Sequence, residues 1–239
     1  MDTPVERRLT PESLHNILRA LLFASAVCTG MLLVRFGFVG DTRFRFLGFF
    51  GNLLLAWIPL VLALWMRRLE KSGRPVWFWS AAVAWLLFFP NAFYLVTDLI
   101  HFNKFGTDGV YKWFDLLMAA SFACGGMFLG SLSLYLLHHH VRERFGWRQG
   151  WVFATGILAL GAFGIYLGRF LRLNSWWVVT RPLKLTRTLA TLTEPERLTE
   201  AIAFSTAFFF FSLGVYCFLV SLARLHEAPQ WSGRQDSNL

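Results

Sequence analysis

The sequence predicts an all-α membrane protein, a polytopic bundle of about six transmembrane helices with a short interfacial helix before the last one. Of the 239 residues, 56% are hydrophobic and only 15% are charged, well below the roughly 25% of an ordinary soluble domain. The charged residues gather in short clusters, and the uncharged stretches between them are long enough to cross a bilayer, which takes about 20 helical residues. Aromatic residues near the ends of these stretches suit anchoring at the membrane–water interface.

The uncharged stretches define six transmembrane runs in a single integral membrane domain, residues 1–239. The first run follows Thr10-Pro11-Glu12, which suits an N-cap, a proline in the first turn and an early acid. Because Arg19 falls inside this helix, its side chain must reach back to the interface. A cleaved signal peptide is the alternative here, although no convincing cleavage site follows the apolar core. The expected runs are residues 14–34, 46–66, 76–98, 116–138, 149–169 and 201–223.

The connection before the last run is expected to contain a surface helix at about residues 182–192. Leu185, Leu189 and Leu192 share one helical face there, while Lys184 and Arg187 lie away from it. This pattern is typical of a short helix that lies flat on the membrane surface.

The charge distribution limits the partners and the topology. The formal net charge of +9 would indicate nucleic-acid binding in a soluble protein. Here the basic residues lie at the ends of apolar runs, where they hold helix ends against anionic headgroups, so the lipid bilayer is the expected partner and nucleic acid is not. Outside the basic connection before the last run, Lys and Arg are more numerous on the side that holds both termini, which predicts that both termini are inside.

Glycine, proline and cysteine add expectations about packing. Gly126 and Gly130 on the fourth helix, and Gly164 and Gly168 on the fifth, have the spacing that lets helices approach closely within a bundle; a homodimer seam is the alternative. Pro90 lies inside the third helix, where a kink would help to open a cavity, although membrane helices often tolerate proline. The cysteines lie in separate apolar runs without a close-spaced pair, so no disulfide or zinc motif is expected.

A polar stripe follows Pro90 at the end of the third expected helix. At about 100° per residue, Asn91, Tyr94, Asp98 and His101 fall on one face of an α-helix. These side chains cannot point at lipid without a large cost in free energy, so they must face protein, water or a ligand. The stripe is therefore the centre of the candidate site.

Two other segments are expected to meet the stripe on the outer side of the membrane. The fourth helix begins near Asp115, and the fifth ends near Arg169 and Arg172. An arginine there would bind an anionic group through two parallel hydrogen bonds, and Asp98 would orient that arginine or titrate. The candidate ligand-binding residues are Asn91, Tyr94, Asp98, His101, Asp115, Arg169, Arg172, Asn174 and Trp176.

Structural roles compete at several of these positions. Asp98 and Arg169 can form a plain ion pair that anchors two helices, and Asp115 can serve as an N-cap. Asp98 and His101 could supply two metal ligands, but the spacing provides no third, so no metal is expected. The sequence also has no phosphate loop and no nucleophile elbow, and no cofactor is expected.

The leading hypothesis is a protein that binds or moves a small solute or lipid headgroup through an outward-facing polar pocket. The second is a membrane-embedded enzyme acting on a lipid headgroup, with His101 or Asp98 as general acid or base. The third is an accessory or assembly subunit whose polar stripe docks a membrane-protein partner. The fourth is that the polar residues only hold helices together, at about 1 kcal/mol per hydrogen bond. Of these hypotheses, binding or transport is favoured over an enzyme.

Several segments together resemble a bacterial family of multipass integral membrane proteins, the domain-of-unknown-function family thirteen-sixty-one. They include N-L-L-L-A-W-I-P-L, P-N-A-F-Y-L-V-T-D-L-I-H-F, W-F-D-L-L-M and G-I-Y-L-G-R-F-L-R-L-N-S-W, within residues 40–225. The resemblance implies a location in the bacterial cytoplasmic (inner) membrane but no activity. Trp177 stands where an acid would be expected. The family pattern matches at Pro90, Asn91, Tyr94, Thr97, Asp98, His101, Asp115, Arg169, Asn174 and Trp176.

Overall fold

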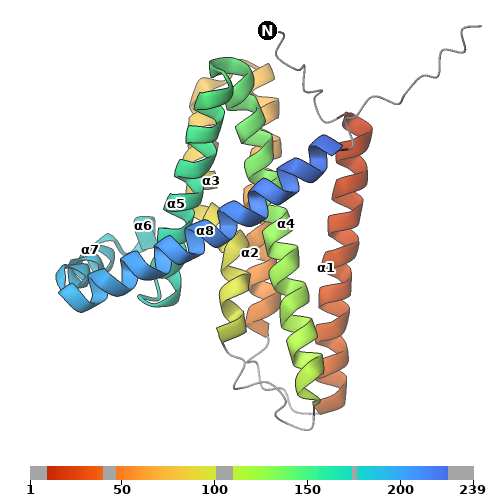
Figure 1. Cartoon of the computed structure of the whole chain (residues 1–239), viewed down its shortest axis with the longest axis vertical. Helices are drawn as coiled ribbons and strands as arrows, with labels where there is room; N and C mark the ends of the chain where they lie inside the picture. The colour runs from red at the N-terminus through yellow and green to blue at the C-terminus, as the bar shows by residue number, and fades with distance from the viewer. Residues whose placement is uncertain (1–9, 40–46, 101–109, 174–176, 226–239) are drawn as a thin grey trace, which may run out of the picture.

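The computed structural model describes residues 10–39, 47–100, 110–173 and 177–225, and this part of the chain is helical, without a β-strand (Figure 1). Between α5 and α8 lie the short helices α6 (Trp177–Thr180) and α7 (Pro182–Ala190) and the 3-10 helix η3 (Thr191–Thr193). The long helices are α1 (Pro11–Val39), α2 (Leu47–Lys71), α3 (Pro75–Thr97), α4 (Lys112–Phe145), α5 (Trp147–Arg169) and α8 (Pro195–Leu225).

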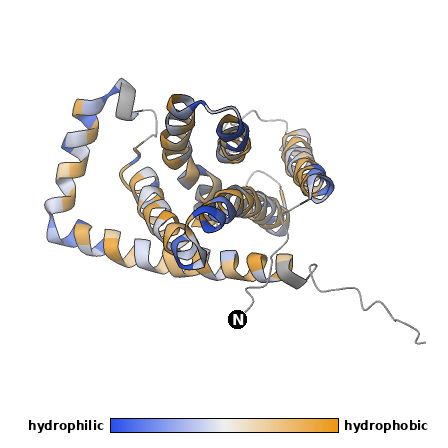
Figure 2. Ribbon diagram, turned by 90° about the horizontal axis from the view of Figure 1, so that it is seen from above, coloured by the Kyte–Doolittle hydropathy of each residue, from blue (hydrophilic) through white to orange (hydrophobic). Residues whose placement is uncertain are grey.

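The six long helices are each long and apolar enough to cross a membrane. Large apolar side chains such as Phe23, Val152 and Phe210 are exposed on the surface of the bundle. Hydrophobic residues recur along the ribbons of the long helices (Figure 2). Contiguous apolar surface on this scale requires lipid rather than water around it. The predicted all-α, multipass membrane fold is confirmed.

Most of these helices continue beyond the uncharged stretches. The longest, α4, begins at Lys112 and ends at Phe145, so it includes His138-His139-His140 and the basic residues that follow. An uncharged stretch marks only the part of a helix that lies in hydrocarbon, whereas the helical hydrogen bonds continue into the interfacial turns.

Glycines of α4 bring this helix close to α3. A methyl group added at Gly126 would overlap the carbonyl oxygen of Ala92, and one added at Gly130 would overlap the ring of Phe93. Side chains at these positions would hold the two backbones apart. The small residues spaced along α4 therefore allow close packing between two helices of the same bundle.

Glycines of α5 approach α3 from another direction. A methyl group at Gly164 would lie 2.7 Å from Cγ of Pro90, and one at Gly161 would lie 3.1 Å from the ring of Phe89. Pro90 is inside α3, as predicted, and its ring is part of this contact. Because both neighbours pack this tightly, α3 is fixed between α4 and α5, and the polar residues at its end are positioned precisely relative to α5.

The last helix, α8, lies obliquely across the bundle, with its main contacts on α5 and further contacts on α4 (Figure 1). His138 of α4 and Tyr216 of α8 form a buried hydrogen bond of 2.7 Å between Nδ1 and the phenol oxygen. The amphipathic α7 precedes α8, and none of its residues is buried. The short helix predicted before the last span is therefore present, although it ends at Ala190 and the chain continues as η3.

Candidate functional site

An ion pair joins the ends of α3 and α5. Nη1 of Arg169, the last residue of α5, lies 2.9 Å from Oδ1 of Asp98, which follows α3 directly. The two side chains are 11% and 9% exposed, respectively. Buried charged groups are stable when they face other polar groups, and the buried Asp98 faces Arg169 and not lipid.

Arg169 also caps the C-terminal end of α3. Its Nη2 donates a 2.8 Å hydrogen bond to the carbonyl oxygen of Thr97, and Nη1 lies 3.2 Å from the phenol oxygen of Tyr94. The last carbonyl groups of a helix have no partner within the helix and carry a partial negative charge, so a cation is favoured there. The guanidinium carbon lies 5.4 Å from the centre of the Tyr94 ring, close enough for a cation–π contribution. The guanidinium is thus held by several acceptors on one helix.

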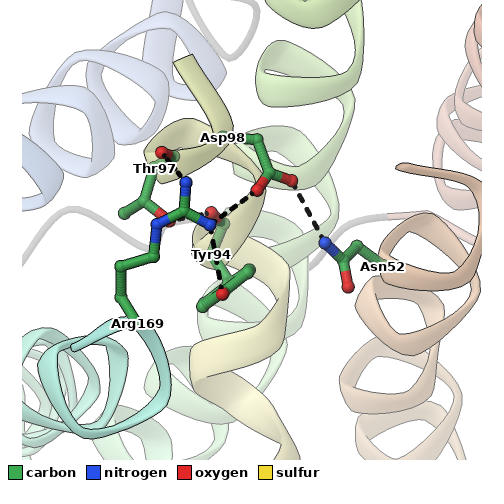
Figure 3. Close-up of polar contacts among 5 residues, drawn as sticks. All are labelled: Asn52, Tyr94, Thr97, Asp98 and Arg169. Atoms are coloured by element: carbon green, nitrogen blue, oxygen red, sulfur yellow. Dashed lines mark hydrogen bonds and ion pairs between the residues drawn. The ribbon is translucent and has the colours of Figure 1, made fainter. Parts of the chain in front are cut away.

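A third helix reaches the same carboxylate. Nδ2 of Asn52, near the start of α2, donates a 3.1 Å hydrogen bond to Oδ2 of Asp98. Figure 3 shows the Asp98 carboxylate between the Arg169 guanidinium and the Asn52 amide. We call Asn52, Tyr94, Thr97, Asp98 and Arg169 the polar cluster; α2, α3 and α5 all contribute to it.

Asn52 was missed by the sequence analysis, although a signal was available. It is an amide within the otherwise apolar stretch that begins α2, and a polar side chain in a membrane helix usually faces a partner inside the bundle. Asn91, which was predicted to belong to the site, is half-buried, and its Nδ2 donates to the carbonyl oxygen of Phe88 at 3.1 Å.

Asp115 takes part in a second buried ion pair. Nε of Arg35, near the end of α1, lies 2.7 Å from Oδ1 of Asp115, and Nη2 lies 3.4 Å from Oδ2. The side chains are 3% and 0% exposed. Tyr111 is the N-cap of α4, so the interpretation of Asp115 as an N-cap is wrong. Its carboxylate binds a guanidinium of α1, a partner that the sequence analysis did not foresee.

The remaining predicted residues are distributed as follows. Arg172 lies beyond the end of α5, is exposed and has a positive φ of 53°; the contacts described for the polar cluster do not include it. His101, Asn174 and Trp176 lie outside the described residues.

The polar cluster combines an ion pair with hydrogen bonds from an amide and to a phenol oxygen and a backbone carbonyl oxygen. A guanidinium forms two parallel hydrogen bonds to a carboxylate or phosphate, and here it already makes one to Asp98. Within the described ranges, no group of three or more His, Cys, Asp or Glu side chains is arranged to hold a metal ion. Ion pairing and hydrogen bonding are the interactions that the described side chains of the cluster make.

One family model, described as "Protein of unknown function (DUF1361)", matches residues 51–215, which include α3, α4 and α5 with Asp98, Asp115 and Arg169. No curated protein and no solved structure matches the chain. Because the family match covers well over half of its length, the chain belongs to the DUF1361 family of proteins of unknown function.

Proposed function

We propose that this membrane protein binds, or moves, a small solute or lipid headgroup that carries an anionic group, and that Arg169 of the polar cluster is its main contact. The observation that carries the proposal is the Asp98–Arg169 ion pair, which is almost completely buried at the end of a membrane-spanning helix.

Energetics favour a role beyond holding helices together. Removing two charges from water costs several kcal/mol per ion, and well-packed apolar residues of similar volume often replace a buried ion pair without loss of stability. The α3–α5 contact already has tight glycine packing at Gly161 and Gly164. A pair retained at this depth is therefore a functional-site hypothesis by default.

The contacts also allow acceptors to be exchanged at Arg169. An incoming phosphate or carboxylate can take the place of Asp98 on the guanidinium, while Thr97 and Tyr94 continue to hold it. Asp98 keeps the hydrogen bond from Asn52 during this exchange. Ligand binding would then remove one of the three contacts that join Arg169 to the end of α3, and this weaker link between α3 and α5 gives a physical route from binding to movement.

The proposed setting is the cytoplasmic (inner) membrane of a bacterium, with both termini in the cytoplasm. Outside the basic connection between α5 and α8, Lys and Arg are more numerous on the side of the termini, and this bias supports the orientation. The ends of α3 and α5 would then face outward, and the polar cluster would be reached from outside the cell.

The proposal is tested by thermal unfolding of the purified protein with inorganic phosphate or glycerophosphate as probes, at constant ionic strength. A probe that binds only the native state stabilises it by about 2.7 kcal/mol at 100 times its Kd. Arg169→Lys keeps the charge but loses the planar guanidinium, so the stabilisation by the probe should largely disappear.

The matched control is Arg35→Lys, the same substitution in the other buried ion pair. It should lower the melting temperature without probe but leave the probe-dependent increase intact. If neither probe stabilises the wild-type protein, or if both lysine variants retain the same increase, Arg169 is not the anion contact proposed here.

A further inference from the structure

A cavity of about 750 Å³ lies at the opposite end of the bundle from the polar cluster. It is lined by the end of α2, the α2–α3 turn, the first turns of α3, the end of α4 and the beginning of α5. Its volume is within the range of roughly 300–1,000 Å³ that is typical of ligand sites.

The polar residues of this cavity all lie at helix ends, where the interface is expected. Nδ1 of His140 lies 3.2 Å from Oε2 of Glu70, and Nη1 of Arg144 lies 3.4 Å from Oε1 of the same carboxylate. Arg74, in the α2–α3 turn, is exposed and also lines the cavity. His140 and Arg144 thus hold the one acid of the mouth, and Arg74 adds a further positive charge there, so the mouth suits an anionic group.

The deeper wall is aromatic and aliphatic. The rings of Trp85 and Phe153 stack at 6.2 Å with an interplanar angle of 18°. Nε1 of Trp85 donates a 2.7 Å hydrogen bond to Ser133, so the polar atom of this indole is already occupied. Leu86 and Ile157 extend the wall. A flexible hydrocarbon chain fits this part of the cavity, and a polar solute does not.

The distance between the two parts corresponds to one leaflet of a bilayer. From Arg74 to Leu86, α3 rises by about 18 Å at about 1.5 Å per residue, while half of a hydrocarbon core of about 30 Å is about 15 Å. Trp79 and Leu86 line the cavity and are also exposed on the outer surface of the bundle. The cavity therefore opens sideways toward the position of the acyl chains.

From the charged mouth, the apolar wall and this depth, we infer that the cavity binds an anionic phospholipid of the surrounding membrane. The phosphate lies beside Arg74 and Arg144, and one acyl chain lies along Trp85 and Phe153. This site is separate from the polar cluster and does not depend on the function proposed for that cluster.

The test is native mass spectrometry of the full chain in detergent with equal amounts of phosphatidylglycerol and phosphatidylcholine. The wild-type protein should retain phosphatidylglycerol in preference. The double variant Arg74→Ala/Arg144→Ala should lower its retention about tenfold or more, because each removed group is a charged hydrogen-bond donor. Arg148→Ala is the control, since Arg148 is an exposed arginine at the same end of the bundle that does not line the cavity.

A second variant tests the apolar wall without a change of charge. Ala82 lines the cavity and is half-buried, so Ala82→Phe should fill the space of the acyl chain and reduce retention of both lipids. Equal retention of the two lipids by the wild-type protein would overturn the inference, because it indicates unselective surrounding lipid. So would a loss for Arg148→Ala as large as that for the double variant, or unchanged retention in Ala82→Phe.

Discussion

Asp115→Asn is expected to destabilise the protein more than Asp98→Asn, although both remove the acid of an Asp–Arg pair. The Arg35 and Asp115 side chains are 3% and 0% exposed. Loss of one charge from so deeply buried a pair costs about 3–5 kcal/mol, because the other charge loses its counter-ion. Arg169 is 11% exposed and keeps its hydrogen bond to the Thr97 carbonyl oxygen, so loss of the Asp98 charge should cost about 1–3 kcal/mol.

The measurement is the free energy of unfolding of both variants in the same lipid–detergent mixture. Arg35→Met/Asp115→Leu, which replaces both charges by apolar groups, should recover most of the stability lost in Asp115→Asn. If Asp98→Asn is as destabilising as Asp115→Asn, the Asp98–Arg169 pair contributes as much to the stability of the fold as the Arg35–Asp115 pair. That result would contradict the energetic reason for a ligand at Arg169.

Three further results are expected. Gly126→Ala should destabilise the bundle by about 1–3 kcal/mol because the added methyl group overlaps a backbone oxygen of α3. Gly125→Ala, whose added methyl group has nothing within 4 Å, should be neutral or stabilising by up to about 1 kcal/mol. Equal free energies of unfolding for the two variants would contradict this packing. Asn52→Leu should cost about 1 kcal/mol, because it removes a hydrogen bond to the carboxylate of the polar cluster, and an unchanged melting temperature would argue against that bond. If α7 lies on the membrane surface, a spin label at position 189 should be accessible to oxygen from the lipid phase and a label at 187 to an aqueous reagent, whereas two aqueous labels would exclude that placement.

The helices and the position of the polar stripe on α3 were predictable because both depend on local sequence. Long uncharged stretches specify spans wherever they occur, and the interval from Tyr94 to Asp98 specifies one face of a helix regardless of its neighbours. The contact between Asp98 and Arg169 was foreseen as a possible pairing because the third and fifth spans end on the same side of the membrane, and it is present at 2.9 Å.

The partners of the carboxylates depend on features that local sequence does not contain. Whether Asp115 faces Arg35 or the polar cluster depends on the rotation of α4 about its axis and on which helix packs against it, and the two residues are 80 positions apart. Asn52 and Asp98 are 46 positions apart and meet only because α2 packs against α3. Glycine positions indicate that helices approach closely, but not which helix lies opposite.

The central claim, that Arg169 holds an anionic ligand, is tested most directly by mass spectrometry of the small molecules released when the purified protein is unfolded. The wild-type protein and Arg35→Lys should release the same anionic molecule in nearly stoichiometric amount, and Arg169→Lys should release much less of it. A phospholipid from the cavity at the other end would be present in all three samples and is distinguished in that way. An identical set of released molecules from all three proteins would contradict the claim.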